Sequence, residues 1–373
     1  MNPVYITGTG VWNPPDIITN EELVESFNRY ADLFNLEHEK EIAAGEVTAL
    51  PHSSVEFIEK ASGIKQRYVM AKAGVLDPTR MVPMLPERAD DELSIMAEIG
   101  VAAAKQALEA AGREGGEIDL VIVAASNHQR PYPAIAVEIQ NALGCAGYGY
   151  DMNVACSSAT FGMEQAANAI RSGQAKKALV LGPEITSGHL EWRDRDCHFI
   201  FGDVSTAVLL ESEPSPAAKQ VWQILGSKAA TSFSSNIRNN AGFLNRCDES
   251  GLGKRDKLFY QEGRKVFKEV CPMAADHIAG HLQSHGFAPN QVRRYWLHQA
   301  NLGMNQLIAR KLLDRDATLD EAPVILDRYA NTASAGSIIA FHDHSADLAA
   351  GDVGVICSFG AGYSIGSHVV RKL

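Results

Sequence analysis

A chain of 373 residues is longer than one hydrophobic core usually serves, so two domains or two closely packed halves are expected. Its formal net charge of −11 argues against nucleic acid or an anionic membrane as the main partner. The six cysteines form no CxxC pairs, which indicates reduced thiols and no zinc framework. Because the N-terminus lacks a signal-peptide pattern and no apolar run is long enough to span a membrane, we expect a soluble cytoplasmic protein.

The first residues contain a glycine pattern that resembles a nucleotide-binding loop. A short strand over residues 4–6 is expected to run into the Thr-Gly-Thr-Gly segment of residues 7–10. The third glycine and the helix of a dinucleotide fingerprint are missing, so a nucleotide site is not favoured. Asn20 is expected to cap a helix that begins at Glu21, with more helix and a surface loop after it.

Helix and strand patterns alternate through the middle of the chain. Residues 93–111 carry apolar side chains at helical spacing, and Gly112 ends the run. The apolar segment 118–124 is typical of a strand buried on both faces of a sheet. Further strand and helix patterns follow at residues 134–143, around Cys156, and at 178–181 and 205–210. This alternation predicts an α/β fold.

A second series of the same kind follows a stretch rich in Glu, Ser and Pro at residues 211–216. Its strands and helices are expected at residues 222–225, 261–285, 294–297, 304–313 and 353–357. The Gly-Asp-Val segment at Gly202 resembles the one at Gly351, and the strand before Ser126 resembles the strand before His298. We therefore predict two halves, residues 1–215 and 216–373, that repeat one βαβαβ unit.

Cys156 lies where a short strand ends and an alanine-rich helix begins. The unpaired N–H groups and the dipole at a helix start favour a thiolate, so the pKa of this thiol is expected to fall. An inert buried thiol is the alternative. In the second half, His298 follows the apolar strand 295–297, where α/β proteins place ligand groups, although it could equally be a hydrogen-bonded core histidine.

Two more strand-end features complete the set. Asn331 precedes a run of small residues and could serve the site or cap a helix. The Ser-Phe-Gly-Ala-Gly segment 358–362 follows a buried strand, and its glycines allow backbone N–H groups to form an oxyanion hole. A cysteine, a histidine, an asparagine and a glycine-rich turn at four strand ends make a coherent active site for nucleophilic catalysis.

These motifs resemble the thiolase-fold condensing enzymes, and within them the β-ketoacyl-acyl-carrier-protein synthase III family. The matching segments are ITGTG with a following TNEEL, ACSS, GDVSTAVLL, LHQAN, ANTASAGSI and SFGAGYSIGS, which span nearly the whole chain in family order. The resemblance implies a five-layered αβαβα fold built from two pseudo-repeated halves. It also implies an acyltransferase that needs no cofactor besides the coenzyme A thioester it uses as substrate.

The resemblance assigns roles to individual residues. Cys156 would accept an acyl group from a thioester. His298 and Asn331 would bind the thioester carbonyl of malonyl-acyl carrier protein and stabilise the enolate formed by decarboxylation. The backbone N–H groups of Cys156 and Ala361 would form the oxyanion hole, and Phe359 would keep the decarboxylation site dry.

The chain departs from the family at the expected substrate-binding surfaces. Phe57 and Ala61 occupy the positions of a Trp and an Arg that usually clamp the adenine of coenzyme A, so Phe57 is a candidate for coenzyme A binding. Gly303 replaces a common basic residue. The candidates for docking the carrier protein are Lys268, Arg310 and Lys311, for which a solvated charged face is the alternative.

Extra residues near 27–53 and 70–91 are expected at the acyl-chain entrance, which favours a primer longer than acetyl, of medium chain length. Tyr132 matches an aromatic residue that reaches the acyl pocket of the neighbouring subunit, and family members are homodimers. His277, His281 and His285 share one face of a predicted helix, but no carboxylate accompanies them. A half-exposed stripe is therefore favoured over a metal site, and no metal is expected.

The predicted reaction is a decarboxylative Claisen condensation of an acyl-CoA with malonyl-acyl carrier protein in fatty-acid biosynthesis. An enzyme of secondary metabolism, or one that joins two acyl-CoA molecules head to head, is the alternative. A non-enzymatic partner of another synthase is less favoured because Cys156 and His298 are both present. A papain-like hydrolase has the same order of Cys, His and Asn, but its context does not match an α/β repeat.

Overall fold

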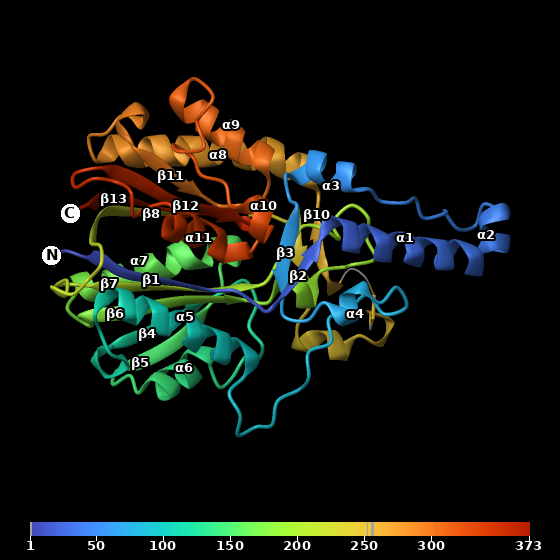
Figure 1. The fold of residues 1–373 in the computed structure, drawn as a ribbon, viewed down its shortest axis with the longest axis horizontal. Coiled ribbons are helices and arrows are strands. Elements are labelled where there is room, and N and C mark those ends of the chain that lie inside the picture. The colour runs from blue at the N-terminus through green and yellow to red at the C-terminus, as the bar shows by residue number, and fades with distance from the viewer. Residues whose placement is uncertain (1, 252, 255–256) are drawn as a thin grey trace.

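The computed structural model describes residues 2–251, 253–254 and 257–373. Within these residues, nine strands form one mixed sheet in the order β11-β12-β13-β8-β1-β7-β6-β4-β5 (Figure 1). The strands are β1 Tyr5–Trp12, β4 Leu120–Ala124, β5 Tyr148–Met152, β6 Lys177–Glu184, β7 Val204–Glu211, β8 Trp222–Ser234, β11 Arg294–Leu297, β12 Val353–Gly360 and β13 Gly362–Lys372. Two small sheets pair β2 (Asp16–Thr19) with β3 (Gln66–Val69) and β9 (Ile237–Asn239) with β10 (Phe259–Gln261).

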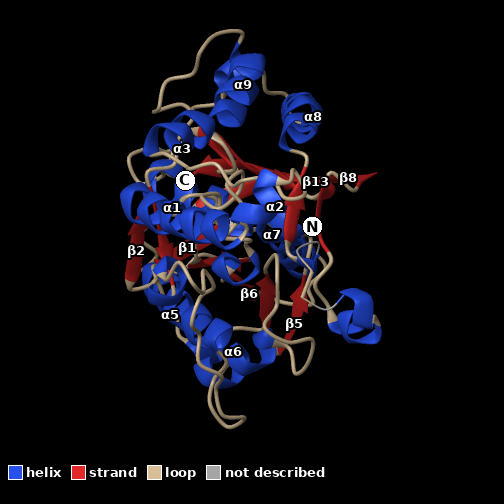
Figure 2. Ribbon diagram, turned by 90° about the vertical axis from the view of Figure 1, so that its right-hand side faces the viewer, coloured by secondary structure: helices blue, strands red, loops and turns tan. Residues whose placement is uncertain are grey.

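The two halves of this sheet form two layers. Helices lie outside each half and between the halves, which gives the five-layered αβαβα arrangement predicted from the sequence (Figures 1 and 2). The outer layer of the first half contains α5 (Ile95–Ala111) and α6 (Ile135–Leu143), and that of the second contains α8 (Gly263–Ser284) and α9 (Leu302–Leu313). Between the halves lie α7 (Ser158–Arg171) and α11 (Gly336–Asp343). No helix in the described part of the chain is both long enough and apolar enough to cross a membrane.

The two halves repeat one strand arrangement. In the first half β1, β7, β6 and β4 are neighbours in that order, and in the second half β8, β13, β12 and β11 follow the same sequence of antiparallel and parallel pairings. The match of the strands before Ser126 and His298 is confirmed, because β4 corresponds to β11. The match of the Gly202 and Gly351 segments is wrong, since they lead into β7 and β12, which are not equivalent strands.

The glycines of residues 7–10 lie inside β1 and do not form a loop. A Cβ atom on Gly8 would lie 2.0 Å from the carbonyl oxygen of Ala107, and one on Gly10 would lie 2.1 Å from that of Ala103. The two glycines therefore allow the backbone of α5 to approach β1 closely, which explains the pattern without a nucleotide.

The first helix begins one residue earlier than expected. The α1 helix spans Asn20–Glu37 and is capped by Thr19, which forms a capping box with Glu22. Asn20 is buried and serves the core instead, since its side chain donates to the carbonyl of Ile64 and accepts from the Arg67 guanidinium. The assignment of Asn20 as the cap is wrong because Thr19 supplies a hydroxyl at the preceding position.

The segment near residues 27–53, which the resemblance gives as an insertion, forms an arm that projects from the body of the molecule (Figure 1). It consists of the distal part of α1, the short helix α2 (Glu39–Ala43) and the returning chain, which leads into α3 (Val55–Ser62). Asn28 bonds both backbone groups of Ser53, and Asn35 does the same with Leu50. The second insertion contains α4 (Ala73–Leu76), and α10 (Leu326–Tyr329) packs on the adjacent β3.

Substitution of Gly10 by Ala tests the close approach of β1 and α5. The added methyl group has no space against the backbone of Ala103, so we expect a loss of about 1–3 kcal/mol in unfolding free energy and a lower thermal midpoint by circular dichroism. Gly242→Ala is the control, since a Cβ there meets no atom within 4 Å. An unchanged midpoint for Gly10→Ala would contradict this packing.

Candidate active site

Cys156 lies in a single 3-10 turn, Ala155–Ser157, that joins β5 to α7. Ala155 has a φ of 47°, a left-handed conformation that residues with a side chain rarely adopt. The side-chain oxygen of Asn153 accepts a hydrogen bond from the backbone N–H of Ala155 at 2.8 Å and stabilises this conformation. The strained turn presents the thiol at the start of the helix.

The end of β12 lies directly against the thiol. A Cβ atom on Gly360 would be 2.5 Å from the Cβ and 3.0 Å from the Sγ of Cys156, so only glycine fits here. The backbone N–H groups of Ala361 and of Cys156 itself lie near the sulfur and act to lower the pKa of the thiol. These are the two groups that the family resemblance assigns to the oxyanion hole.

The electrostatics of the thiol differ from the sequence-based expectation. Burial, together with the negative charge of Glu184, raises the pKa of the Cys156 thiol to about 12, although the two N–H groups act in the opposite direction. The expected fall in the pKa of Cys156 is therefore wrong for the chain without substrate. The free energy lost by removing a thiolate from water is larger than the free energy gained from the N–H groups at the helix start.

His298 follows β11 and is 1% exposed. Its backbone N–H donates to the carbonyl of Cys357 at 2.8 Å, and its ring meets Phe359 edge to face with centroids 5.2 Å apart. Burial lowers the pKa of His298 to about 4, so the imidazole is neutral at physiological pH. Its Nδ1 has no hydrogen-bond partner among the described residues.

Asn331 lies between α10 and a second 3-10 turn, Ala333–Ala335, that leads into α11. Its backbone N–H donates to Ile200, and its side-chain oxygen accepts from the N–H of Ala333 at 2.9 Å. Ala333 has a φ of 50°, so this turn repeats the conformation of the turn at Ala155. Because the oxygen is engaged, the amide nitrogen is the part of Asn331 that can donate to a ligand.

The two turns correspond in sequence as well as in structure. Asn153-Val-Ala155-Cys156 matches Asn331-Thr-Ala333-Ser334, and each sequence precedes a helix of the central layer. The two turns pack against one another, and the Cys156 turn also packs against β12. The structure thus brings Cys156, Phe359 with its neighbour His298, and Asn331 to one place. The repeated Asn-x-Ala pattern was the sequence signal for this pairing of turns, which the comparison of the two halves had missed.

Phe57 lies on α3, where its ring packs edge to face on Phe199. The guanidinium carbon of Arg195 is 3.9 Å from the centre of the Phe57 ring. Sequence reasoning missed Arg195, because it lies 138 positions away from Phe57 and has no distinguishing pattern of its own. The position of Ala61 carries no side chain for a clamp, and its carbonyl accepts from Asn301.

The three candidate docking residues are exposed on the outer layer of the second half. Lys268 lies on α8, and Arg310 and Lys311 lie in the last turn of α9, which packs against α8. Arg310 is paired with Asp316. A Cβ atom at Gly303 would lie 3.2 Å from the side-chain oxygen of Asn301 and 3.5 Å from the ring of Phe267, so the position of the missing basic residue borders that ring.

The histidines on α8 do not form a half-exposed stripe as expected. His277 and His281 are buried and both bond the hydroxyl of Ser367 on β13, because α8 packs directly over this strand, while His285 is exposed. Among the described residues, no group of three or more His, Cys, Asp or Glu side chains could hold a metal ion.

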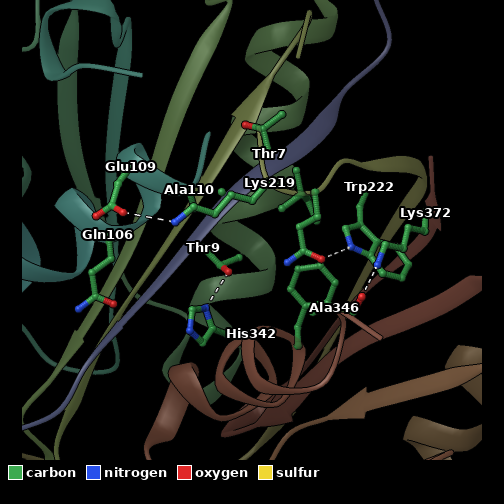
Figure 3. A pocket seen from close by; sticks show the side chains of 14 residues that line it. Thr7, Thr9, Gln106, Glu109, Ala110, Lys219, Trp222, His342, Ala346 and Lys372 are labelled. Atoms are coloured by element: carbon green, nitrogen blue, oxygen red, sulfur yellow. Dashed lines mark hydrogen bonds and ion pairs between the residues drawn. The ribbon is translucent and has the colours of Figure 1, made fainter. Parts of the chain in front are cut away.

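A cavity of about 440 Å³ lies away from the candidate site, between β1, α5 and α11 (Figure 3). Thr9 bonds His342 in its wall, and Trp222 and Lys372 close one side. None of Cys156, His298 or Asn331 lines it.

Comparison with known proteins identifies the family. The family described as 3-Oxoacyl-[acyl-carrier-protein (ACP)] synthase III matches residues 150–232, and its C-terminal region matches residues 282–372. The chain is 62% identical over 349 residues to the beta-ketodecanoyl-[acyl-carrier-protein] synthase of Pseudomonas aeruginosa, covering 94% of this chain and 100% of that protein. The chain belongs to the 3-oxoacyl-[acyl-carrier-protein] synthase III family.

This synthase also shares its fold with solved structures of the family. The crystal structure of 3-oxoacyl-[acyl-carrier-protein] synthase III from Aquifex aeolicus is 25% identical and matches with a TM-score of 0.76 over 99% of both chains. The priming β-ketosynthase of the R1128 polyketide pathway, at 21% identity, matches with a TM-score of 0.78 over 99% of this chain and 96% of that one. The synthase is therefore a thiolase-fold condensing acyltransferase.

The raised pKa predicts how Cys156 reacts before substrate binds. Because the thiolate is a small fraction of the thiol below the pKa, alkylation of Cys156 by iodoacetamide should rise about tenfold per pH unit and reach no plateau below pH 10. Peptide mass spectrometry separates this reaction from that of the exposed Cys247. A plateau near pH 8 would show that the thiol ionises much more easily.

Proposed function

We propose that this synthase condenses a medium-chain acyl-CoA with malonyl-acyl carrier protein to give a 3-oxoacyl-acyl carrier protein in fatty-acid biosynthesis. The observation that supports it best is the combination of groups at one place. The Cys156 turn packs against the turn that follows Asn331 and against the end of β12, whose Phe359 contacts the neutral ring of His298. This combination suits acyl transfer followed by enolate chemistry.

In the first step the sulfur of Cys156 attacks the carbonyl carbon of the acyl-CoA. The carbon–sulfur bond to coenzyme A breaks, the thiol proton leaves with the coenzyme A thiolate, and the acyl group stays on Cys156. The N–H groups of Cys156 and Ala361 stabilise the oxyanion that forms during this transfer, because both lie near the sulfur and hence next to the carbonyl carbon that it attacks. Because its raised pKa keeps the thiol protonated before the reaction, the thiol loses its proton during this step.

In the second step malonyl-acyl carrier protein loses carbon dioxide, and the electron pair of the broken bond forms an enolate of the thioester. His298 and the amide nitrogen of Asn331 donate hydrogen bonds to the enolate oxygen. The enolate carbon then attacks the acyl group, and the Cys156 thiolate leaves. A neutral imidazole suits this role, since an anionic side chain would repel the enolate, and the buried Phe359 helps to exclude water.

Two observations support a medium-chain primer: the product named for the Pseudomonas aeruginosa relative, and an apolar cluster next to the Asn331 turn. A product named beta-ketodecanoyl carries ten carbons, of which malonyl supplies two, so the primer of that relative has eight. Both inserted segments contribute buried apolar side chains, such as Phe27 and Met81, to one cluster that also contains Phe201. Phe201 pairs with Asn331, so this cluster adjoins the turn that carries Asn331, which supports a primer longer than acetyl.

We assign one surface of the chain to each of three partners: coenzyme A, the carrier protein and a second subunit. The stacked pair of Phe57 and Arg195 offers a flat cationic and aromatic face for adenine. Lys268 and Lys311 offer positive charge to an acidic carrier protein. Strand β5 is an edge of the sheet, and Tyr132, in the loop that leads into α6, is 82% exposed, which suits a homodimer in which Tyr132 enters the partner's acyl pocket. Free thiols and these substrates fit the cytoplasm.

The alternative function is a condensation in which the acyl group of Cys156 is transferred to an acceptor bound to coenzyme A. Gly303 lacks the basic side chain that carrier docking commonly uses, which favours an acceptor bound to coenzyme A instead of a carrier protein. In that case two CoA thioesters would be joined, and the exposed lysines would serve only as a solvated face.

Incubation with octanoyl-CoA should leave one octanoyl group on Cys156, detected by intact and peptide mass spectrometry. Added malonyl-acyl carrier protein should then release 3-oxodecanoyl-acyl carrier protein and carbon dioxide. Malonyl-CoA in its place should react slowly, and faster turnover with malonyl-CoA would favour the alternative function. No adduct with any acyl-CoA from two to twelve carbons would contradict the proposal.

Two variants serve as controls for this experiment. Cys156→Ala should form no adduct. His298→Ala should still form the adduct but lose condensation by about 100- to 1,000-fold, because one of the two donors to the enolate is missing. Loss of the adduct in folded His298→Ala would contradict the division of roles between the two steps.

Charge reversal at the docking surface tests the carrier protein separately. Lys268→Glu with Lys311→Glu should raise KM for malonyl-acyl carrier protein by about three- to tenfold and leave acylation by octanoyl-CoA unchanged. Lys105→Glu, exposed on α5 in the opposite outer layer, is the matched control. Equal KM values for the double variant and the control would overturn the assignment of this surface.

A further inference from the structure

Glu184 is a buried carboxylate at the end of β6 that joins the two halves of the molecule. From the first half, Ser126 donates its backbone N–H to Oε1 at 2.9 Å and its hydroxyl to Oε2 at 2.6 Å. From the second half, Ser334 donates its backbone N–H to Oε1 at 3.2 Å and also its hydroxyl to the same atom. Four donors from two sequence-distant segments thus converge on one carboxylate that is 1% exposed.

The first half of this network reaches the nucleophile turn. The carbonyl of Ser126 accepts a hydrogen bond from the side chain of Asn153 at 2.8 Å. The other end of the Asn153 amide accepts from Ala155, the left-handed residue immediately before Cys156. Glu184, Ser126, Asn153 and Ala155 therefore form a continuous chain of hydrogen bonds to the turn that presents the thiol.

The second half of the network reaches the Asn331 turn. Ser334 lies three residues after Asn331 and occupies the place in its turn that Cys156 occupies in the other. The Asn331 side chain holds Ala333, the residue before Ser334. The bonds from Ser334 to Glu184 therefore fix the position of this turn relative to the nucleophile turn, without a direct contact between Glu184 and a substrate atom.

The carboxylate also acts on the thiol through its charge. All four donors to Glu184 are neutral groups, so they stabilise its negative charge but do not cancel it. Ser334, which binds Glu184, belongs to the turn that packs against the Cys156 turn, so the carboxylate lies close to the thiol. Its charge raises the pKa of the Cys156 thiol in addition to burial. Burial raises the pKa of Glu184 itself to about 7, so at pH 8 the carboxylate is mostly ionised.

We propose that Glu184 is a positioning residue of this synthase that fastens the Asn331 turn to the nucleophile turn and places a negative charge beside the resting thiol. The inference rests on the proposed function for its effect on condensation. Its effect on the thiol does not, since that is measured without any substrate. The role depends on two features of the side chain. Its four hydrogen bonds align the Cys156 turn, which acts in acyl transfer, with the Asn331 turn, which acts in condensation. Its negative charge disfavours the thiolate of Cys156 until an acyl-CoA reacts.

Glu184→Gln and Ser334→Ala separate the two effects. Glu184→Gln keeps the size of the side chain but removes the charge, so iodoacetamide should alkylate Cys156 at pH 8 about three- to tenfold faster than in the unchanged chain. Ser334→Ala keeps the charge, so its alkylation rate should stay within about twofold of that value. Both variants should lower the rate of malonyl-acyl carrier protein decarboxylation by about tenfold or more, because the Asn331 turn loses a fixed position.

Glu211→Gln is the matched control, since Glu211 is also a buried glutamate, on the neighbouring strand β7, and it is paired with Arg113. It should change neither rate, and circular dichroism should show that all variants are folded. An unchanged alkylation rate in folded Glu184→Gln would overturn the role of the charge. Unchanged decarboxylation in Ser334→Ala would overturn the positioning role, even if Glu184→Gln does not fold. Failure of octanoyl-CoA turnover in the unchanged chain would instead contradict the proposed function.

Discussion

The contact between two equivalent turns at the centre of the molecule determines the geometry of the active site. Each turn places an alanine in the left-handed conformation, Ala155 in one and Ala333 in the other, and each is stabilised by an asparagine two residues earlier. This conformation costs on the order of 1–3 kcal/mol per residue, and the surrounding layers compensate for it. The result is that one turn presents a thiol and the other an amide at the same place.

Burial shifts the pKa values of His298 and Cys156 in opposite directions and keeps both side chains uncharged, which suits condensation. It keeps His298 neutral, so the imidazole can donate a hydrogen bond to an enolate without a titration near neutral pH. It also keeps the Cys156 thiol protonated in the resting chain. The same removal of water that weakens the free nucleophile protects the acyl-enzyme and the enolate, because both would be lost to hydrolysis or protonation in a wet site.

An apolar cluster lies next to the two turns, on the side of Asn331. Residues from both insertions and from the segment around Trp192 bury their side chains together, and Phe201 connects this cluster to Asn331 through a backbone pairing. The framework common to the family thus positions the reacting groups. The segments near residues 27–53 and 70–91, the first of which forms a projecting arm built on α1, add their apolar side chains to this cluster.

Much of this protein could be predicted from its sequence, because strand and helix periodicity, Gly112 as a helix stop and the order of the motifs are local properties. Those patterns predicted the layered fold, the family and the elements that carry Cys156, His298 and Asn331. The pKa of the thiol, the role of Arg195 beside Phe57 and the bonds of Glu184 depend on residues that meet only after folding. Desolvation and long-range contacts are properties of the assembled layers, so only the tertiary structure decided them.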